Sequence, residues 1–304
     1  MAIGFLFPGQ GSQFTGMGEE FYREFPQVRE IFGEASERVK VDFPKLMFEE
    51  NEKLNQTRYT QPAILLFSGT IFKLLEGEKG ELNWGYGVGH SLGEFTGLTA
   101  GGGLDLIDGV ELVKRRGELM EEAFQTGEPG SMMVVLGLPD EKIEEICQNS
   151  GLKIYPANYN SDGQLVVAGL RSHLQKAEPL FKEAGAKRVM LLNMSVASHC
   201  PLLEPAVEPL RQMLTQFLNP TFKPMVSNVT AQPYSTKGEG LELLPIQLTK
   251  PVRYKESIKN IDDKIDFYVE VGGKVLMGLN RRLTKKRTYP ITDLKSFQKV
   301  LDLL

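Results

Sequence analysis

The sequence has few of the residues that build disulfide-linked or metal-binding proteins. Its 304 residues include only two cysteines and three histidines. Cys147 and Cys200 lie in chemically different surroundings, so we expect neither a disulfide framework nor a cysteine-rich zinc site. The histidines are His90, His173 and His199, and none belongs to an HExxH pair. The sequence therefore indicates a reduced protein without a bound metal.

An excess of positive charge and long apolar runs are also absent. Lysine and arginine total 35 against 39 acidic residues, a net charge of −4, which disfavours a nucleic-acid binder that relies on a general positive field. No apolar run approaches the ~18 residues that span a bilayer. The first run, Ala2 to Pro8, is too short for a signal peptide and follows no basic segment. We therefore expect a cytoplasmic protein that binds neither nucleic acid nor membrane.

Apolar segments at both ends of the chain predict a large α/β domain. Ile3–Phe7 is a strand that enters a tight loop, and Pro62–Leu75 is a buried helix. A second strand, Trp84–Val88, leads into the helical run Glu94–Ala100. Further elements are expected as helices at 106–120, from Pro201 to Phe217 and at Asp293–Leu303, and as strands at Pro224–Val229 and Phe267–Val271.

The pattern changes between residues 127 and 196. Strands are predicted at Ser131–Leu138, Lys153–Ala157, Leu165–Ala168 and Lys187–Leu192, and helices at Asp140–Gln148 and Ser172–Ala184, with a turn-rich stretch at Asn158–Gln164. The resulting order, β-α-β-β-α-β, is typical of a ferredoxin-like subdomain. We therefore expect a catalytic domain formed by residues 1–126 and 197–304 and an insertion formed by residues 127–196.

Gly89-His90-Ser91-Leu92-Gly93 fits G-x-S-x-G between a predicted strand and a predicted helix. In that context a sharp turn exposes the Ser91 hydroxyl, and the unpaired N–H groups at the helix start favour the oxyanion that forms when a serine attacks a carbonyl. The motif alone leaves open a glycine-rich turn with an exposed serine that has no chemical role.

A serine nucleophile needs a base, and His199 is the best candidate. His90 adjoins Ser91, so its side chain is expected to point away from the hydroxyl, and His173 is expected to face solvent. His199 lies just before the helix that Pro201 opens, where the positive helix end keeps an imidazole neutral. The alternative is a loop histidine without a task.

Arg116 lies roughly 50° from the centre of an apolar helical stripe through Val113, Gly117 and Met120, whereas Arg115 faces water. Its planar guanidinium is therefore positioned to bind a carboxylate at a partly buried site. The alternative is a rim residue that covers the core with its methylenes.

Several short motifs occur together from about residue 3 to residue 300. They are Phe7-Pro8-Gly9-Gln10-Gly11-Ser12-Gln13, Gly89-His90-Ser91-Leu92-Gly93-Glu94, Arg116-Gly117, Asn158-Tyr159-Asn160, Ser195-Val196-Ala197-Ser198-His199 and Gln247-Leu248 with Pro251-Val252-Arg253. In this order they resemble the malonyl-CoA:acyl-carrier-protein transacylases of dissociated fatty acid synthesis. The resemblance implies an α/β-hydrolase-like large domain with a ferredoxin-like insertion, which agrees with the predicted elements.

The resemblance also implies a role for each candidate residue. Ser91 would be the nucleophile and His199 the base, oriented by the backbone carbonyl of Gln247, while the backbone N–H groups of Gln10 and Leu92 would form the oxyanion hole. Arg116, His90 and Asn160 would bind substrate, Arg116 through the malonyl carboxylate. Malonyl-CoA would be the donor and a carrier protein's phosphopantetheine the acceptor, with no bound cofactor or metal. We expect a monomer.

Acyl carrier proteins of this pathway are strongly acidic, so basic surfaces are candidate docking sites. Lys187-Arg188 forms one, and Arg281-Arg282 with Lys285-Lys286-Arg287 forms another. A solvated basic face is the alternative for each of them.

Two departures from the family pattern leave other functions open. Glu270-Val271-Gly272-Gly273-Lys274 lacks the usual proline and is one residue shorter, so that loop is expected to be altered. Val196-Ala197-Ser198-His199 partly resembles methylmalonyl-selective acyltransferases of polyketide synthases, so malonyl selectivity stays open. The competing functions are a trans-acting acyltransferase or acyl hydrolase of polyketide assembly, and a carrier-protein-binding scaffold. Arg116 argues against a plain hydrolase, and the complete residue set argues against a scaffold.

Overall fold

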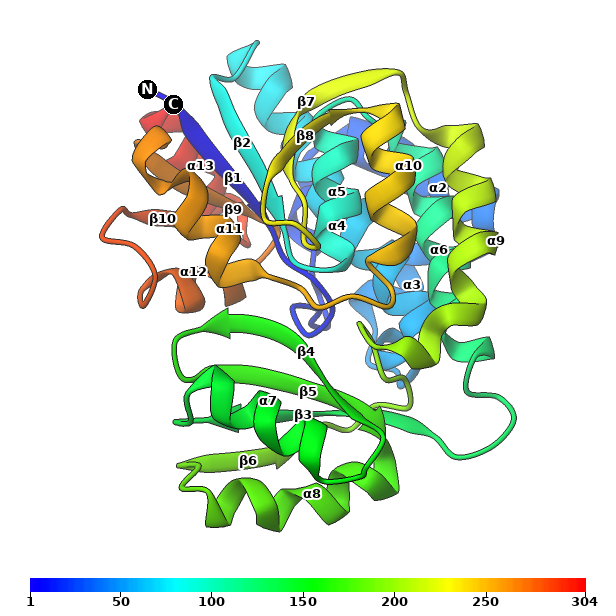
Figure 1. The fold of residues 1–304 in the computed structure, drawn as a ribbon. Coiled ribbons are helices and arrows are strands. Elements are labelled where there is room, and N and C mark those ends of the chain that lie inside the picture. Colours follow the sequence, from blue (N-terminus) through cyan, green and yellow to red (C-terminus); the bar gives the residue numbers. More distant parts are fainter.

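The chain forms two β-sheets of different kinds, as the computed structural model, which describes residues 1–304, shows (Figure 1). The larger sheet has six strands in the order β10-β9-β1-β2-β7-β8. These are β1 (Ile3–Phe7), β2 (Trp84–Gly89), β7 (Thr221–Val226), β8 (Pro233–Thr236), β9 (Phe267–Val271) and β10 (Thr288–Ile291). All neighbours run parallel except β7 and β8. The α/β expectation is confirmed.

Helices cover both faces of this sheet, which is why β1 is apolar throughout. Phe5 and Phe7 belong to the main core of 54 residues, whereas Leu6 belongs to a separate cluster on the opposite face. The main core packs under α2 (Pro26–Val39), α4 (Thr57–Lys79), α5 (Leu92–Ala100), α6 (Leu106–Glu122), α9 (Glu204–Phe217), α10 (Lys237–Ile246) and α13 (Leu294–Leu303). The opposite face is covered by α11 (Tyr254–Ile261) and α12 (Val275–Asn280). The short helices α1 (Glu19–Glu24) and α3 (Phe43–Phe48) complete this part of the chain.

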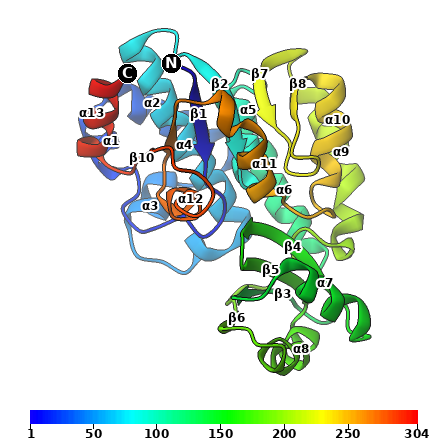
Figure 2. The same cartoon turned by 60° about the vertical axis from the view of Figure 1, so that its left-hand side comes forward.

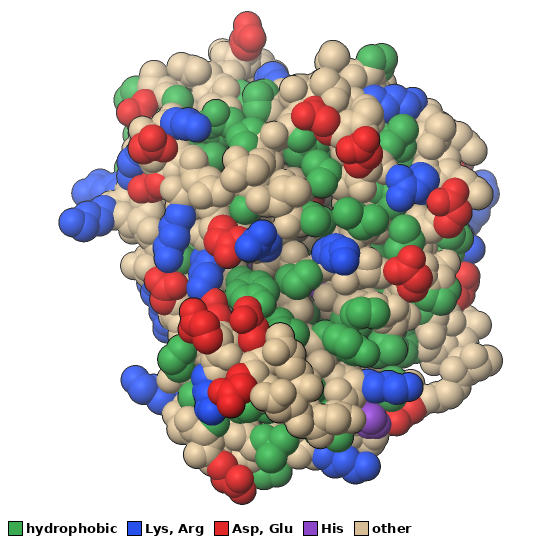
Figure 3. Space-filling model, in the orientation of Figure 1, with side chains coloured by type: hydrophobic (Ala, Val, Ile, Leu, Met, Phe, Trp, Pro, Cys, Tyr) green, Lys and Arg blue, Asp and Glu red, His purple; other side chains and the backbone are tan.

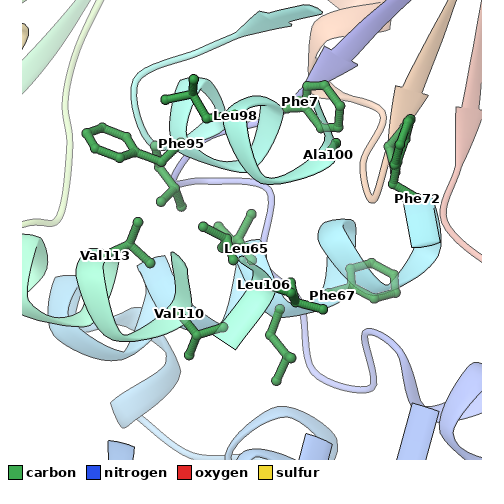
Figure 4. Close-up of a cluster of buried hydrophobic side chains, with 14 of the residues drawn as sticks. Phe7, Leu65, Phe67, Phe72, Phe95, Leu98, Ala100, Leu106, Val110 and Val113 are labelled. Carbon is green, nitrogen blue, oxygen red and sulfur yellow. The ribbon is translucent and has the colours of Figure 1, made fainter. Parts of the chain in front are cut away.

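Three helices converge where the site is built. Figure 4 shows Phe95 of α5, Val113 of α6 and Leu65 of α4, which belong to one cluster of buried side chains in the core. All three side chains are fully buried. This packing fixes the position of α5, whose first residue follows Ser91, relative to α6, which carries Arg116.

Two glycines allow α5 to begin directly against the sheet. A Cβ atom at Gly93 would lie 1.8 Å from the carbonyl oxygen of Phe7, and one at Gly89 would lie 2.0 Å from the amide nitrogen of Glu94. Neither contact involves a side chain that could move aside. Any other residue would therefore push the helix away from β1 and β2.

The second sheet lies against one end of the larger one (Figures 1 and 2). Its strands are all antiparallel, in the order β4-β5-β3-β6. They are β3 (Gly130–Leu136), β4 (Ile154–Ser161), β5 (Gln164–Leu170) and β6 (Arg188–Leu191), with α7 (Asp140–Asn149) and α8 (Arg171–Glu183) packed on one face. The predicted ferredoxin-like order of elements is confirmed.

Two local predictions are wrong. The stretch after Ala157 is not a turn, because β4 continues to Ser161, where it pairs with β5 and also contacts a distant segment. The amide of Tyr159 donates to the carbonyl of Val252 at 2.9 Å, and the amide of Val252 donates to the carbonyl of Ala157 at 2.8 Å. Pro201 opens a 3-10 turn, and α9 begins only at Glu204.

None of the helices combines the length and apolar character that crossing a bilayer requires.

Candidate active site

A cavity of about 580 Å³ lies between the two sheets, beyond the carboxyl ends of β1 and β2. The larger sheet and its helices contribute Gln10, Gln61, His90, Ser91, Leu92 and Met120, and the second sheet contributes Met132, Val134, Asn158, Asn160, Gln164 and Val166. The cavity thus brings together six of the predicted site residues: Gln10, His90, Ser91, Leu92, Asn160 and His199. Arg116 and Gln247 are fully buried and lie behind its wall.

Ser91 has a strained backbone conformation that its neighbours hold in place. Its φ of 55° and ψ of −108° are unfavourable for a residue with a side chain. The Ser91 amide donates to Oδ1 of Asn228 at 2.7 Å, and its carbonyl accepts from Nε2 of Gln247 at 3.1 Å. Both polar groups of the strained peptide are therefore paired, and the hydroxyl is presented to the cavity.

His199 joins the serine to Gln247. Its Nε2 lies 2.7 Å from the Ser91 hydroxyl oxygen, and its Nδ1 lies 2.7 Å from the backbone carbonyl oxygen of Gln247. Because a carbonyl can only accept, Nδ1 carries the proton and Nε2 is left as the acceptor for the serine hydroxyl. This arrangement suits removal of a proton from Ser91.

The imidazole is neutral for a different reason from the predicted one. Burial, together with the positive charge of Arg116, lowers the pKa of His199 to about 3. The expected cause was the end of the following helix, but only a 3-10 turn follows His199. The sequence predicted the neutral ring correctly and attributed it to the wrong cause.

Arg116 is completely buried, so the alternative of a rim residue is wrong. Its Nη1 donates to Oε1 of Gln61 at 2.8 Å, and its Nη2 donates to Oε1 of Gln247 at 2.9 Å and to Oγ of Ser91 at 3.3 Å. Nε has no partner. Burial lowers the pKa of Arg116 to about 10, which leaves it charged at neutral pH, and the charge of Glu94 opposes this shift. A cation with only neutral acceptors in contact lies next to the serine hydroxyl.

His90 and Asn160 meet across the cavity. The His90 Nε2 atom lies 2.8 Å from Oδ1 of Asn160, which can only accept, so His90 donates. Burial lowers the pKa of His90. The ring is therefore engaged with the second sheet rather than with Ser91.

Two backbone amides are free to face a ligand. Gln10 lies in the turn after β1 and Leu92 begins α5, and both line the cavity. Neither amide donates to a carbonyl outside the regular helix and strand bonding. Their position at the cavity wall agrees with the expected pair of donors.

The helix α12, which follows the loop after β9, contributes part of the cavity wall. Glu270 is buried and accepts from the amides of Leu276 at 3.0 Å and Met277 at 2.7 Å. This fixes the start of α12, so that Val275 and Leu276 line the cavity. Gly272 has a φ of 82°, which the tight turn requires.

The basic docking candidates lie in different parts of the molecule. Lys187 and Arg188 are exposed at the start of β6, and Arg281 is exposed directly after α12. Figure 3 shows basic side chains gathered over the loop between α12 and β10, at the left edge of that view. Lys286 is not free there, because its amino group contacts the carbonyls of Asp262 and Ile265.

Both cysteines and the third histidine, His173, lie outside the site. Cys147 and Cys200 are buried and unpaired, and burial raises the pKa of each thiol to about 12. His173 accepts a hydrogen bond from the amide of Lys153 at 2.8 Å. No three histidine, cysteine or acidic side chains are grouped as metal ligands.

Sequence reasoning missed three polar residues that hold the site. Gln61 contacts Arg116, Asn228 contacts Ser91, and Glu94 contacts both Asn228 and Gln247. A signal was present for two of them, since Gln61 and Glu94 are polar residues beside otherwise apolar helical runs. Asn228 gave no signal, because it follows β7 in an ordinary loop segment.

Comparisons with known proteins identify the family of this chain. Residues 4–292 match the acyl transferase domain family. A curated relative, the malonyl CoA-acyl carrier protein transacylase of Bacillus subtilis, is 37% identical over 99% of this chain and 97% of its own length. The crystal structure of the malonyl-CoA:acyl carrier protein transacylase from Helicobacter pylori superposes with a TM-score of 0.97 at 42% identity, covering 100% of this chain and 98% of that one.

A further solved structure is a malonyl-transacylase in complex with a type II PKS acyl-carrier protein. It has a TM-score of 0.94 and 35% identity, and each chain is covered completely. Sequence and structure therefore agree over the whole length: the chain belongs to the acyl transferase domain family, among the malonyl CoA-acyl carrier protein transacylases.

Proposed function

We propose that this protein transfers a malonyl group from malonyl-CoA to the phosphopantetheine thiol of an acyl carrier protein, through an ester on Ser91. The observation that carries the proposal is the pair of 2.7 Å contacts from Ser91 through His199 to the carbonyl of Gln247, beside the buried Arg116. The names of the relatives supply the substrates.

In the first half-reaction the Ser91 oxygen attacks the thioester carbonyl while its proton passes to Nε2 of His199. The amides of Gln10 and Leu92 donate to the resulting oxyanion, and each such donor is worth roughly 3 kcal/mol in the transition state. When the tetrahedral intermediate collapses, the carbon–sulfur bond breaks and His199 returns the proton to the departing CoA sulfur. The malonyl-serine ester remains.

The second half-reaction repeats these steps with the carrier protein's thiol as nucleophile. His199 takes the thiol proton, sulfur attacks the ester carbonyl, and Ser91 leaves with the proton as a free hydroxyl. Because the acyl group moves between two thioesters without electron transfer, we propose that no bound cofactor or metal takes part. The backbone carbonyl of Gln247 keeps the Nδ1 proton of His199 in place.

Arg116 is proposed to bind the free carboxylate of the malonyl group. A buried guanidinium without an acidic partner in contact is costly, and an incoming carboxylate removes that cost. Gln61 and Met120 lie between Arg116 and the cavity and both contact it, so they must move to admit the carboxylate. His90 and Asn160 line the same cavity and are proposed to contact the rest of the substrate.

The central test is the mass of the intact protein after incubation with malonyl-CoA. We expect the addition of one malonyl group on Ser91, located by peptide mapping, and no addition to the Ser91→Ala variant. Labelling of a different residue, or undiminished labelling of the variant, would refute the proposed nucleophile.

We propose that the carrier protein docks beside the cavity, against Lys187 and Arg188 at the start of β6 and Arg281 after α12. All three side chains are exposed, and Arg281 directly follows α12, whose Val275, Leu276 and Leu279 line the cavity. A cytoplasmic location follows from the proposed substrates and remains a proposal.

One observation favours a second candidate function, acyl transfer in polyketide assembly. The solved relative bound to a type II PKS acyl-carrier protein shows that closely similar chains serve such carriers. The chemistry is the same, so the two functions differ only in the carrier. Rates of transfer from the malonyl-enzyme to purified fatty acid and polyketide carrier proteins would separate them.

A further inference from the structure

Glu94 is a buried acid that the proposed reaction does not use. Its side chain is 1% exposed, although it lies only three residues after the nucleophile. It accepts three hydrogen bonds: from the amide of Asn228 at 3.2 Å, from Nε2 of Gln247 at 2.7 Å and from the hydroxyl of Tyr234 at 2.8 Å. Such complete satisfaction of a buried acid indicates a defined task.

The directions of these hydrogen bonds are fixed by geometry. The Asn228 partner is a backbone amide, which can only donate. Gln247 must present its NH₂ group to Glu94, because its Oε1 already accepts from Arg116. A protonated Glu94 would therefore have no acceptor unless the Tyr234 hydroxyl turned. The donors around Glu94 favour an ionised carboxylate that acts as a common acceptor.

Two of its partners clamp the nucleophile from both sides. Asn228 accepts from the Ser91 amide at 2.7 Å and donates to the Gly89 carbonyl at 2.7 Å. Gln247 donates to the Ser91 carbonyl at 3.1 Å. The strained turn is thus held by two amide side chains, and one carboxylate oxygen of Glu94, Oε2, contacts both residues.

The same carboxylate also reaches the base and the buried cation through Gln247. The backbone carbonyl of Gln247 holds Nδ1 of His199, and its Oε1 holds Nη2 of Arg116. Release of the Gln247 amide would loosen the Ser91 carbonyl and Arg116 together.

We propose that Glu94 is a positioning residue, whose carboxylate anchors Asn228 and Gln247 and thereby fixes the reactive geometry of Ser91. The proposal rests on the proposed function only in taking Ser91 as the nucleophile. It does not depend on which acyl group or carrier the enzyme uses.

Three substitutions separate anchoring from space filling. Glu94→Leu fills the space with an apolar group and removes the acceptor. Glu94→Gln keeps one acceptor oxygen for Asn228 and Gln247 and directs its NH₂ at Tyr234, so it is the conservative rescue. Tyr234→Phe is the matched control, because it removes one bond to the carboxylate and leaves the two that lead to Ser91.

The readout is the rate at which a fluorophosphonate labels Ser91, measured by intact mass on protein whose folded fraction is known from thermal unfolding. Because a misplacement of about 1 Å costs on the order of 100-fold in rate, we expect Glu94→Leu to label about 100-fold more slowly than wild type. Glu94→Gln should lie between the two, and Tyr234→Phe should stay within about threefold of wild type.

Folded Glu94→Leu that labels within about threefold of wild type would overturn the proposal, as would equal rates for the Leu and Gln variants. If Glu94→Leu does not fold, Glu94→Ala, which also removes the acceptor, takes its place, and a labelling rate within about threefold of wild type overturns the proposal. The probe contains no malonyl group. Wild-type protein that reacts with the probe but not with malonyl-CoA would therefore refute the proposed function while leaving the role of Glu94 testable.

Discussion

Two buried ionisable groups, Arg116 and Glu94, lie on either side of Gln247. Arg116 contacts its Oε1 and Glu94 contacts its Nε2, so the amide separates them and no direct ion pair forms. Direct pairing would neutralise Arg116 and leave it less able to attract a second anion. The separation keeps the cation available for a carboxylate that enters the cavity.

Loss of Arg116 should therefore distinguish acyl groups. We expect Arg116→Ala to raise the activation free energy of loading from malonyl-CoA, measured through kcat/KM, by about 2–5 kcal/mol. This is the range observed when one partner of a buried charge pair is removed. The value for acetyl-CoA should change little. The measurement is the rate of acyl-enzyme formation from each donor. Arg115→Ala is the matched control, because Arg115 is 40% exposed and pairs with Glu118 and Glu122 on the surface. Equal losses for both donors would remove Arg116 from carboxylate binding.

At the residue scale the sequence predicted the groups that touch the reacting atoms better than those that hold them. Ser91 and His199 follow from a motif and from the scarcity of histidine, and the structure brings them to 2.7 Å. Asn228 and Gln61 could not be found in this way, because amide side chains are common and their direction depends on tertiary contacts. The burial of Arg116 was missed for a related reason, since helical periodicity gives an angle but not the depth of packing.

At the scale of elements, the junction between β2 and α5 decides the geometry of the site. Gly89 and Gly93 allow the backbones of β1, β2 and α5 to come into contact, and the strained Ser91 lies between them. The helix start is consequently fixed against β1, which also leads into the turn that carries Gln10. The two candidate oxyanion donors thus depend on one close backbone contact.

Gly93→Ala tests that contact. Its Cβ would lie 1.8 Å from the Phe7 carbonyl oxygen, so we expect α5 to shift, malonyl loading to fall by at least about 100-fold and the melting temperature to drop. Gly33→Ala is the control, since a Cβ there meets no atom within 4 Å and a glycine within α2 is replaced. That variant should keep full activity and gain about 0.5–1 kcal/mol in unfolding free energy. Normal loading of Gly93→Ala with malonyl-CoA would show that the turn between β2 and α5 tolerates a displaced helix.

Most elements were predictable because their apolar residues have the period of a helix or a strand. The helix α6 and the strand β1 are clear examples, and the β-α-β-β-α-β order identified the second sheet. The continuation of β4 to Ser161 was not predictable, because it depends on pairing with β5 and on a bridge from Asn158 to Val252, nearly a hundred residues away. Local composition there favours a turn, and the tertiary hydrogen bonds override it.

At the scale of the whole molecule, the cavity belongs to neither sheet alone. The reacting groups come from the larger part, while Asn160, Gln164 and Val166 close the opposite wall from the second sheet. The two parts are tied beside the cavity by the pairing of Asn158 with Val252 and by ion pairs of Lys255 with Asp140 and of Lys259 with Asp162. A carrier protein that delivers its thiol to Ser91 must therefore approach along the boundary between them.

Charge reversal at the basic docking candidates should weaken docking of the carrier protein without affecting the chemistry at Ser91. Acidic and basic side chains are interspersed over the face in Figure 3, so the net charge of −4 does not prevent a local basic contact with an acidic partner. We expect Arg281→Glu, and separately Lys187→Glu with Arg188→Glu, to raise KM for the holo carrier protein about three- to tenfold, since exposed pairs contribute up to about 1 kcal/mol each. Loading from malonyl-CoA should be unchanged, because none of these residues lines the cavity.

The dependence on salt and on position distinguishes docking from a general charge effect. The increase in KM should shrink as ionic strength rises, because salt screens exposed charges. Lys299→Glu is the control, since Lys299 is exposed on α13, at the opposite end of the molecule from the second sheet (Figure 1). If Lys299→Glu raises KM as much as Arg281→Glu does, overall charge governs association with the carrier protein, and the basic docking candidates are solvated surface. If KM rises only for Arg281→Glu and for Lys187→Glu with Arg188→Glu, the carrier protein approaches over the boundary between the two sheets, where a thiol can reach Ser91.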